Sequence, residues 1–104
     1  MTIDQIIRRC KLVLQDHYGA RLRGVVVYGS AARQQAGPES DIDLLVLLTQ
    51  PFNYFEETRR IIELLYPIQL EAEYLISAKP VFVQDYEQGR FQLYRTAQRE
   101  GIPV

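Results

Sequence analysis

The fold is decided by residues 22–48, which read LRGVVVYGSAARQQAGPESDIDLLVLL. Two apolar runs in this stretch, residues 22–28 and 41–48, are rich in valine, isoleucine and leucine, which predicts two buried strands. A Gly29-Ser30 pair closes the first run, and a segment with a further glycine and a proline leads into the second. We therefore expect two strands of one sheet, with a tight turn directly after the first.

Two acids stand at the start of the second run. Successive side chains on a strand point to opposite faces, so Asp41 and Asp43 share one face of the sheet. Their Cα atoms then lie roughly 6–7 Å apart, at about 3.3 Å of rise per residue. Two carboxylates this close repel each other unless a cation lies between them. The pattern predicts a divalent metal site, together with a phosphate-bearing ligand that binds at the same place.

The glycine–serine pair suits a phosphate. Gly29 has no Cβ, so the backbone can turn tightly and a phosphate can approach it. Ser30 offers a hydroxyl, and a short helix predicted at residues 31–35 would present free N–H groups to an anion. Arg33 would add positive charge on its first turn. A simpler reading of the same residues makes Ser30 only a helix cap and Arg33 a solvated side chain.

Composition narrows the class of protein. The 104 residues suit one domain, residues 1–104, with one modest core, since 47% of them are hydrophobic. The net charge of −1 gives no basic stripe for extended nucleic acid. The single cysteine, Cys10, cannot form an internal disulfide, which fits a reducing compartment. No stretch reaches transmembrane length and the N-terminus lacks a signal-peptide layout, so we expect a cytoplasmic protein.

Capping signals place the first helices. A capping box at Thr2 starts a helix whose apolar residues recur at helical spacing, and Gly19 follows its end. Asn53 is a second cap, for a helix over residues 54–65. Pro67 is predicted to stop that helix.

The last third of the chain predicts a third strand and a final helix. Residues 68–77 alternate between polar and apolar side chains, which is typical of a strand. The Lys79-Pro80 pair is predicted to break it. Asp85 would cap a last helix, which Gly101 ends. Helices and strands thus alternate, which predicts an α+β fold of two layers, a mixed sheet with helices packed mainly on one face.

A third carboxylate would complete the metal site. The candidates on the predicted third strand are Glu71 and Glu73, which share one face by alternation. Either could help to hold a metal or take a proton as general base. Geometry alone does not separate them, and each also fits the role of an ordinary solvent-facing strand residue.

The segments VVVYGSAAR and ESDIDLLV together resemble the signature of the polymerase-beta nucleotidyltransferase superfamily. More closely, they resemble the small minimal nucleotidyltransferase (MNT) proteins of prokaryotes, in which Gly-Ser is followed after ten residues by Asp-x-Asp. The similarity covers nearly the whole chain. It implies a palm-like domain of two layers that transfers a nucleoside monophosphate from a nucleoside triphosphate to a hydroxyl and releases pyrophosphate.

The resemblance also implies roles for single residues. Gly29 and Ser30 would contact the triphosphate of ATP, Asp41 and Asp43 would ligate Mg²⁺, and Glu73 is favoured over its neighbour as the third acid. Several MNT proteins resemble antitoxins that pair with HEPN-type ribonuclease toxins. Some of those transfer AMP to a tyrosine of the partner, which would make the chain an antitoxin of a toxin–antitoxin system.

Two departures from the family pattern leave other functions open. Relatives often carry arginine where this chain has Ala31, and glycine where it has Gln34, so the phosphate side has less positive charge. One alternative is a non-catalytic module that neutralises a partner by binding it. Another is a nucleotidyltransferase for a small molecule or an RNA. A partner protein or a second copy of the chain would be needed to complete the cleft.

Overall fold

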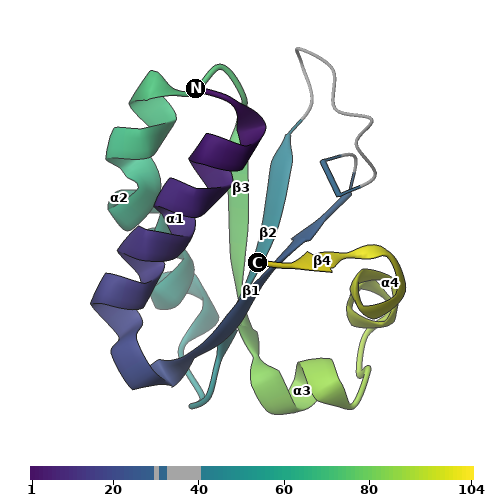
Figure 1. The fold of residues 1–104 in the computed structure, drawn as a ribbon. Helices are drawn as coiled ribbons and strands as arrows, with labels where there is room; N and C mark the ends of the chain where they lie inside the picture. The colour runs from purple at the N-terminus through teal and green to yellow at the C-terminus, as the bar shows by residue number, and fades with distance from the viewer. Residues whose placement is uncertain (30, 33–40) are drawn as a thin grey trace.

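The computed structural model describes residues 1–29, 31–32 and 41–104. Figure 1 shows the elements, which follow one another in the order α1 (Ile3–Tyr18), the 3₁₀ turn η1 (Gly19–Arg21), β1 (Leu22–Tyr28), β2 (Ile42–Leu48), α2 (Tyr54–Glu71), β3 (Ile76–Phe82), α3 (Val83–Glu87), α4 (Gln92–Glu100) and β4 (Ile102–Pro103). Within the described part of the chain, no helix is both long enough and apolar enough to cross a membrane.

The four strands form one mixed sheet in the order β3-β2-β1-β4. β1 runs antiparallel to β2 and to β4, whereas β3 runs parallel to β2. The long helices α1 and α2 lie side by side against one face of the sheet, and the short helices α3 and α4 lie toward the other (Figure 1). The predicted α+β fold with a mixed sheet is confirmed.

Local capping signals set the helix ends as predicted. The Thr2 hydroxyl accepts a hydrogen bond from the backbone N–H of Gln5 at 3.1 Å, and the Gln5 side chain accepts one from the backbone N–H of Thr2 at 2.8 Å. Gly19 closes α1 with a φ of 55°, a conformation that glycine adopts without strain. The Asn53 side chain caps α2 by accepting from the backbone N–H of Glu56 at 3.0 Å.

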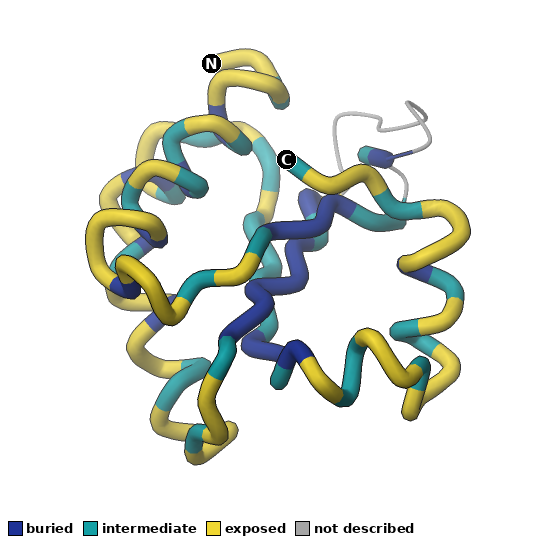
Figure 2. Tube along the Cα trace, turned by 60° about the horizontal axis from the view of Figure 1, so that its bottom comes forward, coloured by how far each residue is buried: buried dark blue, intermediate teal, exposed yellow. Residues whose placement is uncertain are grey.

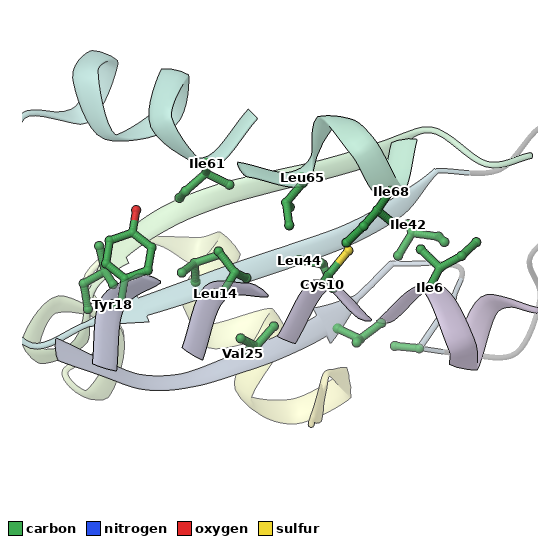
Figure 3. Close-up of a cluster of buried hydrophobic side chains, with 14 residues drawn as sticks. Ile6, Cys10, Leu14, Tyr18, Val25, Ile42, Leu44, Ile61, Leu65 and Ile68 are labelled. Carbon is green, nitrogen blue, oxygen red and sulfur yellow. The ribbon is translucent and has the colours of Figure 1, made fainter. Parts of the chain in front are cut away.

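The larger core lies between the two long helices and the sheet. Figure 3 shows its buried side chains, which come from α1, α2, β1 and β2 and include Ile6, Cys10, Leu14, Ile42, Leu44, Ile61, Leu65 and Ile68. At the end of α1, the Tyr18 hydroxyl donates a hydrogen bond of 2.5 Å to the carboxylate of Glu57 on α2. Burial raises the pKa of Cys10 to about 11, so the thiol is protonated at neutral pH and packs as an apolar side chain.

A smaller core lies on the opposite face of the sheet. Its buried members are Val26, Leu45, Leu47, Val81, Val83 and Ala97, with tyrosines packed at their border. Figure 2 shows that the central strands are buried while the helices turn an exposed side to solvent. Neighbouring residues of β2 divide between the two cores, because side chains alternate along a strand.

The predicted end of the second helix is wrong. α2 does not stop before Pro67 but continues through it to Glu71, and the strand predicted over residues 68–77 is therefore wrong as well. A proline inside a helix removes one backbone hydrogen bond. Burial of Leu65 and Ile68 on either side of the proline offsets that loss, because both pack in the larger core.

The third strand lies later than predicted, at Ile76–Phe82, and contains the Lys79-Pro80 pair that was expected to break it. A proline is tolerated there because β3 is an edge strand, so one side of its backbone needs no hydrogen-bond partner. The single last helix was also predicted wrongly. Asp85 lies inside the short α3, and a separate α4 follows and ends at Gly101 as expected.

Candidate functional site

The turn after β1 touches the acid on β2. Tyr28, the last residue of β1, pairs with Asp43 across the antiparallel ladder. Gly29 follows with a φ of 74°, and a Cβ built on it would lie 2.6 Å from Oδ2 of Asp43. Only a residue without a side chain can let the turn and the carboxylate approach this closely. Asp43 therefore lies directly beside the glycine turn.

The two acids form a region of negative charge at the start of β2. Asp41 is exposed just before the strand, and Asp43 is half-buried within it. Burial raises the pKa of Asp43 above its usual value, the charge of Asp41 raises it further, and Lys79 on β3 lowers it. The larger effects disfavour the charged carboxylate, so a cation bound here would relieve both of them.

Glu71 and Glu73 do not lie on a strand, which corrects the placement from which the third ligand was predicted. Glu71 is the last residue of α2 and forms an ion pair of 3.0 Å with Arg9 of α1. Glu73 is exposed in the bend that follows the helix. In the described parts of the chain, no group of three metal-ligating side chains comes together.

The strand next to Asp43 instead presents a hydroxyl and an ammonium group. In the parallel ladder, Ser77 pairs with Asp43, and Lys79 pairs with Leu45. The sequence alone does not indicate Lys79, because a lysine–proline pair predicts the end of a strand. The signal that could have found it is the apolar run that continues after the proline at residues 81–83.

Two of the predicted phosphate-binding residues lie outside the residues that the structure describes. They are Ser30 and Arg33, and most of the helix predicted at residues 31–35 falls outside as well. Their proposed contacts with a triphosphate therefore stay predictions. Gly29, the third predicted phosphate ligand, is described, and Oδ2 of Asp43 lies 2.6 Å from the position that a Cβ on it would take. Its contact with a triphosphate also stays a prediction.

Tyr28 is a further residue of this region that sequence reasoning did not single out. The pKa of Tyr28 is raised to about 12. Burial is the largest cause, followed by the electrostatic effects of Asp43 and then of Tyr54. The phenol therefore stays protonated and keeps a hydroxyl proton beside the acid at neutral pH.

The donor set at the two acids fits Mg²⁺. Carboxylate oxygens are the ligands that this ion prefers, and it commonly takes only one or two of them together with phosphate oxygens. The pKa of Asp43 is also raised, first by burial and then by the like charge of Asp41. Asp41 and Asp43 would hold the ion, and its remaining ligands would come from the substrate and water.

Solved structures with a similar fold are known. One, of a proposed minimal nucleotidyltransferase, is 25% identical and matches with a TM-score of 0.62 over 100% of this chain and 97% of that chain. A crystal structure of a toxin–antitoxin with AMP-PNP is 14% identical and matches with a TM-score of 0.56 over 91% of this chain and 69% of that chain.

A nucleotidyltransferase candidate from Sulfolobus solfataricus is 18% identical, with a TM-score of 0.54 over 97% of this chain and 83% of that chain. At such low identity, the last two similarities establish the fold alone. No curated protein sequence matches the chain. The family described as "Nucleotidyltransferase domain" matches residues 7–95, which include the glycine turn and both acids. The chain belongs to this nucleotidyltransferase family.

Proposed function

We propose that the chain transfers a nucleoside monophosphate, AMP from ATP, to a hydroxyl group of a partner protein. The observation that carries the proposal is the contact between the glycine turn and the acid. Gly29 leaves no room for a side chain beside Asp43, so a phosphate near the turn would also lie near the carboxylates.

The residues of the site would divide the work as follows. The backbone of the turn at Gly29 would contact the triphosphate, and Asp41 and Asp43 would hold Mg²⁺. The bound ion neutralises charge on the phosphates. The acceptor oxygen forms a bond to the α-phosphorus while the bond to pyrophosphate breaks, and the hydroxyl proton passes to solvent. Such chemistry depends mainly on positioning and charge neutralisation.

The acceptor would be a tyrosine of a HEPN-type toxin, and the chain would act as its antitoxin in the cytoplasm. Two observations support this choice. The toxin–antitoxin structure with AMP-PNP has the same fold. The net charge of −1 gives no overall positive charge to attract an extended RNA.

Label transfer tests the proposal. The chain is incubated with Mg²⁺, ATP labelled on its α-phosphate and the product of the neighbouring gene. We expect label on the partner, and none when Asp41→Asn and Asp43→Asn are combined or when EDTA is added. Equal labelling by the double variant would contradict the proposed site. Label that appears only on RNA or on a small molecule would contradict the proposed acceptor.

A non-catalytic antitoxin is the second candidate. The observation that favours it is the strand beside Asp43, where β3 presents Ser77 and Lys79 and no carboxylate. In this case the chain would neutralise its partner by covering it. Co-purification and growth rescue by the double Asp41→Asn, Asp43→Asn variant would support binding alone, whereas loss of rescue with an intact complex would support catalysis.

A further inference from the structure

A cleft opens on the same face of the sheet as the acids, between β3 and α4. It has a volume of about 200 Å³, and the side chains that line it include Leu45, Tyr54, Lys79, Phe91 and Tyr94. A neighbouring hollow of about 290 Å³ shares Tyr54 and Tyr94 with it. Together the two hollows have the size of a site for a small organic molecule.

The cleft continues from the acid end of the site. Leu45 follows Asp43 by two residues on β2, and its partner Lys79 follows Ser77 by two residues on β3. Two residues along a strand span roughly 6–7 Å, so the cleft begins one such step from the carboxylate. A nucleotide whose phosphates lie beside Gly29 and Asp43 and that extends along β2 in this direction would reach the cleft.

Tyr54 connects the acid end with the cleft. Burial is the main cause that raises the pKa values of Tyr28 and Tyr94, and the electrostatic influence of Tyr54 adds to both. Tyr28 pairs with Asp43, and Tyr94 lines the cleft. Tyr54 and Tyr94 both line the cleft, and the electrostatic influence of Tyr54 reaches Tyr28 at the acid end.

The walls of the cleft suit a flat, partly polar ring. Tyr54 is 46% exposed and Phe91 is 51% exposed, so both rings offer apolar surface to a ligand. Phe91 packs edge to face on Tyr94, with ring centroids 5.2 Å apart, which holds both rings in place. Lys79 adds a positive charge and a hydrogen-bond donor beside the aromatic rings.

We propose that this cleft binds the nucleobase and ribose of the nucleotide whose phosphates are held at Gly29 and Asp43. The inference rests on the proposed function. The base would stack on Tyr54 or Phe91, and Lys79 would contact the ribose or the α-phosphate. Stacking on aromatic side chains tolerates every base, so the cleft would select for a nucleoside over an inorganic phosphate chain rather than for one base.

Binding measurements with two probes test the inference. In calorimetry with Mg²⁺, the probes are a non-hydrolysable ATP analogue and inorganic tripolyphosphate. We expect Tyr54→Ala and Phe91→Ala each to weaken the ATP analogue about 5- to 100-fold, the range for loss of one stacked base. The same variants should leave tripolyphosphate within twofold, since it does not reach the cleft. Tyr66→Ala is the matched control, because Tyr66 is a tyrosine of similar exposure, 55% against 46% for Tyr54, and lies outside the cleft.

The outcomes separate the two proposals. If the wild-type chain binds both probes and Tyr54→Ala binds the ATP analogue as tightly as the Tyr66→Ala control, the cleft is not the base site and the proposed function stands. An equal loss of both probes in Tyr54→Ala would also overturn the cleft proposal. If the wild-type chain binds neither probe, both proposals fail. Tyr54 is the deciding position, because it is exposed and its truncation leaves the smaller core intact.

Discussion

The two faces of the sheet differ in what covers them. The face under α1 and α2, called here the closed face, is packed against two long helices, and hollows of about 460 and 230 Å³ lie at its edges. Among the described residues, none buried in its core is charged. The opposite face has the smaller core and carries Asp43, Lys79 and the aromatic cleft. Successive side chains of β2 point to the two faces in turn, so Leu44 is buried in the larger core and Leu45 in the smaller.

One face of the sheet therefore contributes mainly to stability, and the other face carries the candidate site. Burial of apolar area against two long helices supplies most of the driving force for folding. The closed face can therefore hold the strands in register while the other face carries a carboxylate whose pKa is raised by burial and by a like charge. We expect variants on the closed face to change stability alone, and variants on the acid face to change binding as well.

Truncation of the two neighbouring leucines tests this expectation with the largest effects. Both side chains are fully buried. Leu44→Ala should cost about 3–5 kcal/mol and lower Tm by about 15–25 °C, because the two long helices limit collapse around the cavity. Leu45→Ala should cost about 2–3 kcal/mol, because the smaller core can relax toward the open cleft.

Thermal unfolding and binding of a Mg²⁺–ATP analogue measure the pair. Leu45 lines the cleft, so we expect Leu45→Ala to weaken the analogue, whereas folded Leu44→Ala should bind it normally. Equal losses of stability together with equal losses of affinity would show that the two faces are not independent.

The glycine turn gives the next effect. A side chain at Gly29 would meet Oδ2 of Asp43 at 2.6 Å and would stand at a φ of 74°. Gly29→Ala should therefore cost about 1–3 kcal/mol from the backbone conformation. It should also displace the carboxylate and weaken Mg²⁺–ATP binding at least about tenfold, which is 1.4 kcal/mol.

Gly19→Ala is the control for this variant. Gly19 has a φ of 55°, but a Cβ built on it meets nothing within 4 Å. It shares the backbone cost without the clash, so it should lower Tm and leave nucleotide binding unchanged. Normal binding by Gly29→Ala would contradict the proposed contact between the turn, the phosphate and the acid.

A polar contact on the closed face gives a smaller effect. The Tyr18 hydroxyl joins α1 to Glu57 of α2, and this carboxylate also lies 3.5 Å from Arg60. Tyr18→Phe removes a hydrogen bond to a charged group and should cost about 1.5 kcal/mol in urea unfolding. Tyr66→Phe, on the exposed side of α2, should change the free energy of unfolding by less than about 0.5 kcal/mol. A loss of nucleotide affinity in Tyr18→Phe would argue against the separation of the two faces.

The regions that could be predicted from sequence are those with local signals. The strand over residues 22–28 is bounded as expected, and the second strand begins one residue later than expected, at Ile42. The capping box at Thr2 and the cap at Asn53 are also confirmed. Each of these depends on residues close together in the chain, such as an apolar run or a side chain that caps its own helix.

Residues 66–82 could not be predicted, because tertiary structure decides how two prolines are accommodated there. Pro67 is accommodated by packing on both sides of it, and Pro80 by its place on an edge strand. Neither the core nor the strand order can be read from the local sequence. The third strand was therefore predicted several residues too early. The predicted third ligand, Glu73, was placed on that strand, whereas it lies in the bend after α2.

The site was predictable in part. Alternation along a strand placed Asp43 on one face, and the glycine indicated a turn beside it. The contact between Gly29 and Asp43 needed the antiparallel register, which brings Tyr28 opposite the acid. The effect of Lys79 on Asp43 needed the parallel pairing of two strands that are separated by a whole helix.

The smallest predicted effect has the opposite sign from the others. Burial and Asp41 raise the pKa of Asp43 in the folded chain, so the folded state binds this proton more tightly than the unfolded state does. The stabilisation is complete below the unfolded pKa, near 4, and is lost as the pH rises through the raised value. At pH 7 the charged carboxylate therefore destabilises the free protein.

Asp43→Asn should remove this cost. Solvent reaches the carboxyl and reduces the gain to below about 1 kcal/mol, so we expect Tm at pH 7 to rise by about 2–4 °C. The gain should vanish near pH 3, and Asp16→Asn at an exposed site on α1 should show none. Mg²⁺ should raise Tm of the wild type and not of Asp43→Asn, because a ligand that binds only the folded state stabilises it by mass action. If Asp43→Asn is less stable than the wild type at pH 7 without metal, the charged carboxylate stabilises the fold. The predicted destabilisation by Asp43 in the absence of a cation would then be wrong.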